Sequence, residues 1–316
     1  MRKLLCMLAL LACQAHAQTW PQKTVKVIVP FPPGGVTDSI ARITAEWLSQ
    51  RLGQPVVPDN RPGASGAIAA DLVARAEPDG YTLFSAATPQ LAIVPHVQTI
   101  NYDPLKDFAP ISIVGTNAFA LGCNDNVPAK SLKELVDYAR ARPGELNYGS
   151  PGSGSVGHLT MALFLARAGL KMEAVLYKGG GPAMADLIAG HVNCYFGNYN
   201  ELLPHAGGGR VHILATSGDK RARQLPNVPT VAEQGYPGFR TETWNGYVAP
   251  AGTPREVVER IAREIAAGCK DATFVSRLDK IGVDAVCGTP AEFTQAIRAD
   301  LALWKEAVQA AGVKPQ

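Results

Sequence analysis

Short runs of β-branched residues alternate with amphipathic segments along most of the chain, and this alternation is the strongest constraint on its fold. Residues 25–29 predict a buried strand, the Pro/Gly-rich loop 30–35 follows, and residues 38–48 place apolar side chains at helical spacing. Repeated strand-helix-strand units imply a mostly parallel sheet with helices on both faces. Further strands are expected at residues 55–57, 81–84, 107–122, 146–148, 174–177, 192–196 and 211–215, and further helices at residues 66–76, 131–142, 155–169, 182–189, 199–206, 254–268, 271–281 and 290–311.

The length of 316 residues predicts two α/β domains, because it exceeds the comfortable size of one doubly wound domain. The candidate connections between the domains are the strand-rich segment 116–124 and the loop-rich segment 236–253. If the chain crosses at both places, the C-terminal helices return to the first domain, and two strands join two lobes. The first lobe is then expected to contain residues 18–120 and 247–316, and the second residues 121–246.

Residues 1–17 have the pattern of a signal peptide. Arg2 and Lys3 precede an apolar run at residues 4–13, and residues 15–17 (AHA) match the small-x-small cleavage pattern. We therefore leave this segment out of the fold and expect a mature chain outside the cytoplasm. In the alternative, residues 10–13 form a lipobox, and a lipid is attached to Cys13.

Composition excludes several classes of protein. Hydrophobic residues make up 47% of the chain and charged residues 18%, a globular balance that argues against disorder. The formal charge of +3 is small and evenly spread, so a nucleic-acid partner is not expected.

Four cysteines follow the expected cleavage site, namely Cys123, Cys194, Cys269 and Cys287. In an oxidising compartment they allow three pairings. Proximity in the expected fold favours Cys123 with Cys194 and Cys269 with Cys287, and buried free thiols are the alternative. Neither Cys-x-x-Cys nor His-x-x-x-His occurs, so no metal site is expected.

Three glycine-rich loops lie between a predicted strand and a predicted helix, at residues 32–38, 150–158 and 178–182. Free backbone N–H groups and the positive end of the helix favour an anion at such a place. Each loop alone could be a tight turn without a ligand. Together they indicate binding beyond the carboxyl ends of the strands.

The second loop contains Gly152-x-Gly154-x-x-Gly157, a formal match to the dinucleotide fingerprint. The acidic residue that would bind the ribose is missing, because the strand at residues 174–177 is followed by Lys178. The loop is better explained as a cradle for a small carboxylate. Its donors would be backbone N–H groups and the hydroxyls of Ser150, Ser153 and Ser155.

Catalytic motifs are not evident, since neither G-x-S-x-G nor a phosphate-binding loop occurs. His158 could act as a base for Ser153 or Ser155 in a secreted hydrolase, but a structural or ligand-contacting role is favoured. Asp38 is either a helix cap or a lock on the ligand-binding loop. Lys178 could pair with an anion or be a solvated charge at a strand end. The segment 244–246 (WNG) could line a cleft or pack in a hinge.

The order of the motifs resembles the Bug-type extracytoplasmic solute receptors, the substrate-binding components of tripartite tricarboxylate transporters. The resemblance covers nearly all of the expected mature chain. Its marks are residues 30–35 (PFPPGG) with Asp38 and 41–42, 60–64 (NRPGA), 78–83 (PDGYTL), 102–103, 107–108, 146–150 (LNYGS), 154–155, 158–159, 177–179 (YKG), 186–190 (DLIAG), 225–230 (LPNVPT) and 249–254 (APAGTP).

This resemblance implies a type II periplasmic-binding-protein fold, in which two α/β lobes joined by a two-strand hinge close over a small carboxylate. No cofactor is implied. The partners would be the permease subunits of the transporter, and the alternative is a sensory receptor that signals to a membrane kinase. A monomer is expected because it is the default state of a receptor that diffuses. Gly197 stands where relatives often carry an acidic residue, which argues against recognition of a ligand amino group. The expected ligand-binding residues are Phe31, Pro33, Gly34, Gly35, Val36, Thr37, Asp38, Thr88, Ser150, Gly152, Ser153, Gly154, Ser155, His158, Lys178 and Asn198.

Overall fold

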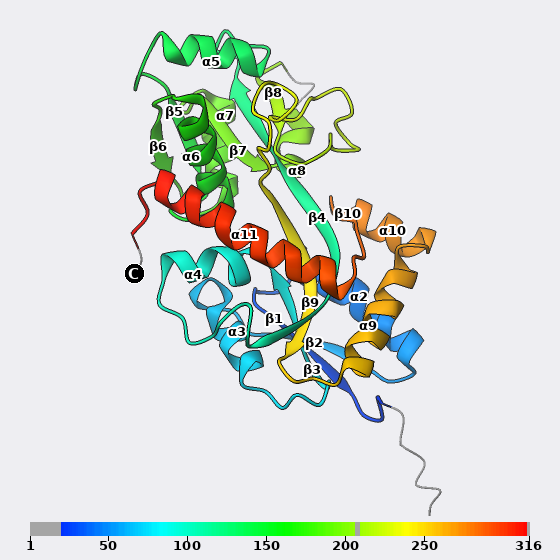
Figure 1. The fold of residues 1–316 in the computed structure, drawn as a ribbon. Coiled ribbons are helices and arrows are strands. Elements are labelled where there is room, and N and C mark those ends of the chain that lie inside the picture. The colour runs from blue at the N-terminus through cyan, green and yellow to red at the C-terminus, as the bar shows by residue number, and fades with distance from the viewer. Residues whose placement is uncertain (1–19, 206–208, 315–316) are drawn as a thin grey trace, which may run out of the picture.

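The computed structural model describes residues 20–205 and 209–314 and shows two α/β lobes joined by two long strands (Figure 1). The expected signal peptide at residues 1–17 lies outside the described residues. Within the described ranges, no helix combines the length and hydrophobicity needed to cross a membrane. The predicted fold class is confirmed.

The first lobe holds the N-terminal strands and most of the C-terminal helices. Its elements are β1 (Val25–Val29), α2 (Val36–Leu52), β2 (Val56–Asn60), η1 (Ala64–Gly66), α3 (Ala67–Ala74), β3 (Thr82–Ala87), η2 (Pro89–Ile93), α4 (Val94–Val97), α9 (Arg255–Gly268), α10 (Ala272–Asp279), β10 (Asp284–Ala285) and α11 (Pro290–Ala310). The two joining strands are β4 (Phe108–Asn124) and β9 (Glu242–Pro250). The second lobe contains α5 (Leu132–Arg140), β5 (Asn147–Ser150), α6 (Val156–Ala168), β6 (Glu173–Leu176), α7 (Gly180–Ala189), β7 (Cys194–Asn198), α8 (Tyr199–Leu202), η3 (Leu203–His205) and β8 (Val211–Thr216).

Helix boundaries follow the cap residues. Ser155 caps α6 by accepting a hydrogen bond from the backbone of His158, and Gly169 ends this helix in the left-handed region. Helix α11 begins with a full capping box formed by Thr289 and Glu292. These local signals explain why the predicted helices lie within a few residues of the observed ones.

Both lobes have the same strand order. The first is ordered β2-β1-β3-β9-β4, and the second is ordered β6-β5-β7-β4-β8. In each lobe the fourth strand is one of the two crossing strands. The expectation of a mostly parallel sheet is confirmed for four of the five strands in each lobe. The exception in the first lobe is β9, which pairs antiparallel with β3 and β4, and in the second it is β4, which pairs antiparallel with β7 and β8. A chain that crosses between the lobes in both directions must insert a reversed strand into each sheet.

Strands β4 and β9 form the hinge. They pair from Phe108 with Pro250 to Ala118 with Glu242, and from Phe119 onward β4 pairs with β7 instead. The expected lobe boundaries at residues 120/121 and 246/247 stay a prediction. The sequence predicts a loop-rich segment at 236–253, but β9 runs through it. Nearly every residue of β9 is buried between two neighbouring strands, so the strand lacks the polar alternation that marks a half-buried strand in a sequence.

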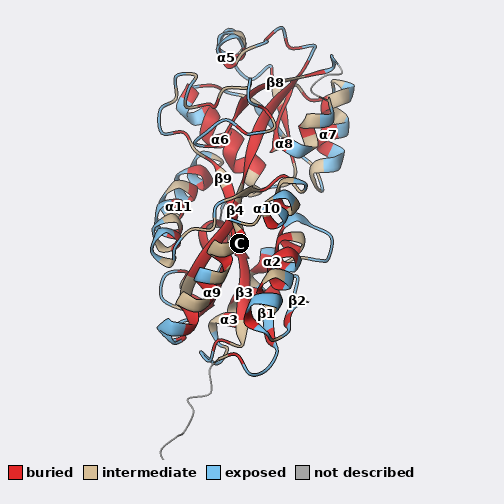
Figure 2. Ribbon diagram, turned by 90° about the vertical axis from the view of Figure 1, so that its right-hand side faces the viewer, coloured by how far each residue is buried: buried red, intermediate tan, exposed pale blue. Residues whose placement is uncertain are grey.

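Helix α11 belongs to both lobes. Its first half, with Phe293 and Ile297, packs into the core of the first lobe, whereas Trp304, Ala307 and Val308 pack into the core of the second. The assignment of the C-terminal helices to the first lobe stays a prediction, and the end of α11 also packs on the second lobe. Figure 2 shows that buried residues line the inner faces of the helices in both lobes.

The described part of the chain contains two disulfides. Cys123 of β4 is bonded to Cys194 of the neighbouring strand β7, and Cys269 at the end of α9 is bonded to Cys287 after β10. These are the pairs that the sequence analysis favours. Each bond lies within one lobe, so neither restrains the movement of one lobe against the other.

Candidate functional site

Two adjoining cavities lie between the lobes. The outer cavity has a volume of about 430 Å³ and the inner cavity about 190 Å³. Phe31, Pro89 and Val156 line both of them, so they form one cleft with two compartments. The inner cavity is also lined by Val36, Thr37, Ala87, Asn117, Phe119, Asn198, Thr243 and Asn245. The outer cavity is also lined by Ser65, Ile93, Val94, Val97, Gln98, Pro151, Gly152, Ser153, Gly154, Ser155, Val313 and Lys314.

The loop before α2 supplies one wall of the inner cavity. Gly35 is the N-cap of α2 and provides no side chain to bond the first backbone N–H groups of the helix. These groups have no partner within the helix, so they are free to bind an anion. Phe31, Val36 and Thr37 line the cavity, whereas Pro33 and Gly34 are exposed and do not.

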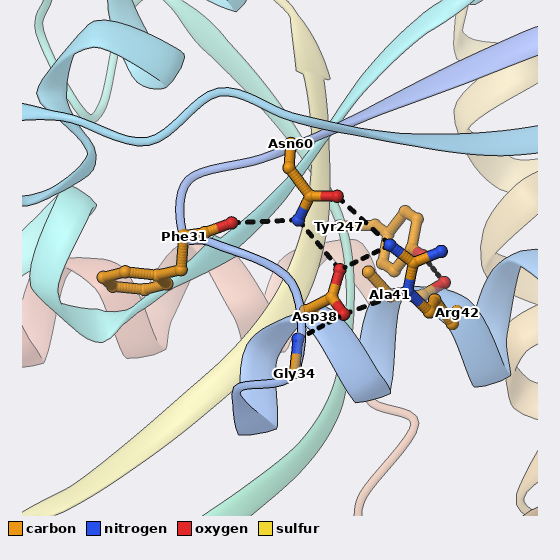
Figure 3. Close-up of polar contacts among 7 residues, drawn as sticks. All are labelled: Phe31, Gly34, Asp38, Ala41, Arg42, Asn60 and Tyr247. Carbon is orange, nitrogen blue, oxygen red and sulfur yellow. Dashed lines mark hydrogen bonds and ion pairs between the residues drawn. The ribbon is translucent and has the colours of Figure 1, made fainter.

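Asp38 holds this loop in place through hydrogen bonds (Figure 3). Its side chain is buried, and its Oδ2 accepts a hydrogen bond of 2.9 Å from the backbone N–H of Gly34. Asn60 Nδ2 donates to Asp38 Oδ1 at 2.8 Å and also to the carbonyl of Phe31 at 2.9 Å. Arg42 completes the network with two bonds to the same carboxylate, of 2.9 and 3.0 Å. Asp38 therefore locks the loop and does not line the cleft.

The Asp38 carboxylate is held in its charged form. Burial acts to raise its pKa, but the hydrogen bonds from Arg42, Asn60 and Gly34 outweigh burial and leave the pKa below its ordinary value. Both carboxylate oxygens of Asp38 are therefore hydrogen-bonded to these donors.

The Ser/Gly loop supplies the wall of the outer cavity from the second lobe. Gly152, Ser153, Gly154 and Ser155 line this cavity. Ser150 is buried beneath them, and its hydroxyl donates to the carbonyl of Gly152 at 3.1 Å. The hydroxyl of Ser155 caps α6. Of the three serines expected to donate to a ligand, Ser153 is the one with an exposed side chain in the cavity wall.

His158 supports the Ser/Gly loop. Its imidazole Nδ1 accepts a hydrogen bond of 3.1 Å from the backbone N–H of Gly154, and its ring stacks on Tyr148 with centroids 6.4 Å apart. Burial lowers the pKa of His158, which favours the neutral ring that this bond requires. The Nδ1 atom is therefore occupied by the backbone and does not activate a serine.

The third glycine of the dinucleotide-like motif has a packing role. A side chain at Gly157 would place its Cβ 2.4 Å from the carbonyl oxygen of Phe196 in β7. Only glycine lets α6 approach the sheet this closely. The motif is explained by packing without a dinucleotide.

Two further expected residues lie away from the cavity walls. Thr88 is fully buried, and its Oγ1 accepts a hydrogen bond of 2.9 Å from the backbone N–H of Trp244. Lys178 is exposed and is not among the residues that line either cavity. Asn198, in contrast, lines the inner cavity.

A chain of polar side chains crosses the floor of the inner cavity, and we call it the hinge hydrogen-bond chain. Thr37 Oγ1 donates to Asn245 Oδ1 at 2.8 Å, Asn245 Nδ2 approaches Asn117 Oδ1 at 3.5 Å, and Asn117 Nδ2 donates to Asn198 Oδ1 at 2.9 Å. It connects α2 of the first lobe to the end of β7 in the second through both crossing strands. Sequence analysis missed Asn117, and the available signal was an amide in the middle of a mostly apolar strand.

The sequence allows two roles for the segment 244–246, to line a cleft or to pack in the hinge, and its residues show both. Asn245 lines the inner cavity, whereas Trp244 is buried against Phe293 of α11. Among the residues that the structure describes, no group of three or more His, Cys, Asp or Glu side chains could hold a metal ion.

Two lobes with the same strand order, joined by two crossing strands around a cleft at the hinge, define a two-lobed solute-binding protein. A family model described as the tripartite tricarboxylate transporter family receptor matches residues 40–313. The chain belongs to this family.

Individual relatives agree with this assignment. Protein BugT of Bordetella pertussis is 36% identical over 306 residues, which cover 96% of this chain and 94% of BugT. The structure of R. palustris Rpa4515 with adipate matches with a TM-score of 0.78 and 37% identity, over 94% of this chain and 100% of Rpa4515. MatC from Rhodopseudomonas palustris with bound malate matches with a TM-score of 0.73 and 29% identity, over 92% and 100% of the two chains. The resemblance to Bug-type receptors is confirmed.

Proposed function

We propose that this receptor binds a small carboxylate in the cleft, with one carboxylate group in the inner cavity. The observation that carries the proposal is the chemistry of the walls. Among the described residues, neither cavity is lined by an acidic side chain, and the inner one presents hydroxyl and amide groups beside the start of α2. Neutral donors and a helix N-terminus suit a carboxylate, which an acidic wall would repel.

Hydrogen-bond donors line the inner cavity from both lobes. The backbone N–H groups of Val36 and Thr37 belong to the first lobe, and the side-chain amide of Asn198 belongs to the second. A ligand that touches both sides binds the closed form more tightly than the open form, so it shifts the equilibrium toward closure. The adipate bound to Rpa4515 and the malate bound to MatC support a carboxylate as the ligand.

The family and the N-terminal sequence pattern support the following statements about location and partners. The receptor is a monomer in the periplasm, reaches it through the signal peptide at residues 1–17, and delivers its ligand to the permease subunits of a tripartite transporter. It binds its ligand without converting it. The occupied Nδ1 of His158 supports binding over hydrolysis.

The test is a binding measurement on the chain from residue 18, unfolded and refolded to remove bound ligand. Adipate, malate and citrate are compared with a diamine of similar length by thermal unfolding and calorimetry. A ligand that binds only the native state raises stability by about 2.7 kcal/mol at one hundred times its dissociation constant. We expect at least one carboxylate to raise the melting temperature and the diamine to leave it unchanged.

An isosteric variant tests the location. Asn198→Asp adds a negative charge to the inner cavity, and Asn227→Asp adds the same charge at an exposed position outside both cavities. We expect Asn198→Asp to weaken carboxylate binding at least tenfold and Asn227→Asp to change it less than twofold. Equal affinities for the two variants would place the ligand elsewhere.

A further inference from the structure

Lys314 is the one ionisable side chain among the described residues that line the two cavities. Every other lining residue is apolar, a hydroxyl, an amide or a glycine or proline of a loop. The lysine lies in the wall of the outer cavity, together with Val313 from the same segment. In Figure 1 the segment after α11 runs down along the side of the molecule between the lobes.

The position of Lys314 follows from the way α11 ends. Gly312 is in the left-handed region with φ 62°, its N–H donates to the carbonyl of Gln309, and the N–H of Val313 donates to the carbonyl of Val308. This pair of bonds is the Schellman ending of a helix. Val313 also packs beside Val308 on the core of the second lobe. The backbone is therefore fixed up to the residue before Lys314.

The walls around Lys314 carry neutral polar groups. Ser153 of the Ser/Gly loop belongs to the second lobe, and Gln98 follows α4 of the first. Gln98 is itself held by a hydrogen bond of 2.9 Å from its Nε2 to the carbonyl of Ala64. Because no acidic side chain lines either cavity among the described residues, the lysine charge is available to an anion that enters the cleft.

We propose that Lys314 binds the second carboxylate of a dicarboxylate whose first carboxylate lies in the inner cavity, and so sets a preference for dicarboxylates over monocarboxylates. The inference rests on the proposed function. The two adjoining compartments differ in charge, since the inner one offers neutral donors and the outer one adds a cation. An ammonium on a flexible stem can follow ligands of different length, which a rigid guanidinium fork would do less well.

The experiment compares adipate with hexanoate, which has the same number of carbons and lacks the second carboxylate. Calorimetry is carried out on the parent chain, on Lys314→Gln and on Lys314→Arg. Lys171→Gln is the matched control. Lys171 is exposed and follows the C-terminal end of α6, whereas the Ser/Gly loop precedes the N-terminal end of this helix. We expect Lys314→Gln to weaken adipate binding about tenfold, to change hexanoate binding less than twofold, and to leave the melting temperature unchanged. Lys314→Arg should retain most of the adipate affinity, and Lys171→Gln all of it.

The salt dependence of adipate affinity is a second readout, and a merely structural effect of the substitution would not change it. Adipate affinity of the parent chain should fall between low and high sodium chloride, and the fall should be smaller in Lys314→Gln. The inference is overturned if Lys314→Gln weakens adipate and hexanoate equally, or if adipate binding is unaffected while the parent chain binds it. If the parent chain binds no carboxylate of either kind, the proposed function fails as well, so the two failures are distinguishable.

Discussion

Trp244 Nε1 donates a hydrogen bond of 2.7 Å to Asp300 Oδ2 and thereby ties the crossing strand β9 to helix α11. Both side chains are buried. The Trp244 ring meets Phe293 of the same helix edge-on, with centroids 4.9 Å apart, while its backbone N–H donates to Thr88. One residue of the hinge therefore holds a strand, a helix and the loop after β3 together.

The difference in free energy of unfolding between the parent chain and the Asp300→Asn variant should depend on pH. Burial raises the Asp300 pKa to about 6, despite the opposing effects of Arg240 and of the Trp244 bond. Because the folded pKa lies above the unfolded value near 4, the folded state binds the extra proton between these values, and its stability falls as the pH rises. Asparagine can still accept from Trp244 and has no such proton.

Urea unfolding from pH 4 to pH 7 measures this effect. The free energy of unfolding of the parent chain, relative to Asp300→Asn, should fall by about 2 kcal/mol across that range. A difference that stays constant with pH would show that Asp300 does not titrate as its burial implies.

Replacing Thr37 by valine should weaken the hinge. The change keeps the shape of the side chain and removes the hydroxyl that donates to Asn245. We expect a loss of about 1 kcal/mol in the free energy of unfolding and weaker carboxylate binding, because Thr37 also lines the inner cavity. Thr160→Val is the matched control, since the buried Thr160 hydroxyl has no hydrogen-bond partner among the described residues. A Thr160→Val protein as unstable as Thr37→Val would contradict the assignment.

Asp38→Asn should release the loop before α2. An amide in place of the carboxylate cannot accept from Gly34, Asn60 and Arg42 together, so we expect a loss of about 2 kcal/mol in stability and weaker ligand binding. The folded pKa of Asp38 is lowered, so its contribution is present above the unfolded pKa near 4 and is lost as the pH falls through the folded pKa. Unfolding curves at pH 7 and pH 3 measure this. An advantage of the parent chain that persists undiminished at pH 3 would argue against the network in Figure 3.

Reduction should destabilise each lobe separately. The bond between Cys123 and Cys194 closes a loop with a sequence separation of 71, and the bond between Cys269 and Cys287 one of 18. Loop-closure entropy predicts losses of about 4 and about 3 kcal/mol when each pair is replaced by alanine. Denaturant unfolding with and without reductant measures both losses. Unfolding of the parent chain that is insensitive to reductant would show that the bonds do not form.

Most of the fold could be predicted because several strands are short apolar runs and because α5, α6, α10 and α11 begin at a side-chain cap. Two segments could not. Strand β9 is buried on both sides and contains Asn245 and Gly246, so it has neither the alternation nor the composition of a typical strand. The helical turns at η2 and α4 contain Pro89 and Pro95, which argue against a helix on local grounds.

The site was predictable where local sequence determines local structure. The glycine-rich loop before α2 and the Ser/Gly loop line the cleft as a loop after a strand should. Sequence does not reveal which way a hydroxyl points, so Ser150 and Thr88 were expected at the ligand but face inward. Asn117 and Asn245 are 128 positions apart and meet only through strand pairing. Lys314 reaches the cleft only because α11 crosses from one lobe to the other.

The exchange of strands has a consequence for the order in which this chain can fold. Strand β3 needs β9 as its neighbour, and Ala87 pairs with Asn245, so the first sheet cannot be completed until the whole second lobe has been made. During synthesis, in which the N-terminus is made first, the edges of β3 and β4 that pair with β9 stay unpaired until residues 242–250 have been made. Such late, distant pairing makes folding slow and leaves open edges that invite aggregation. A holding chaperone would therefore matter most while residues 88–241 emerge.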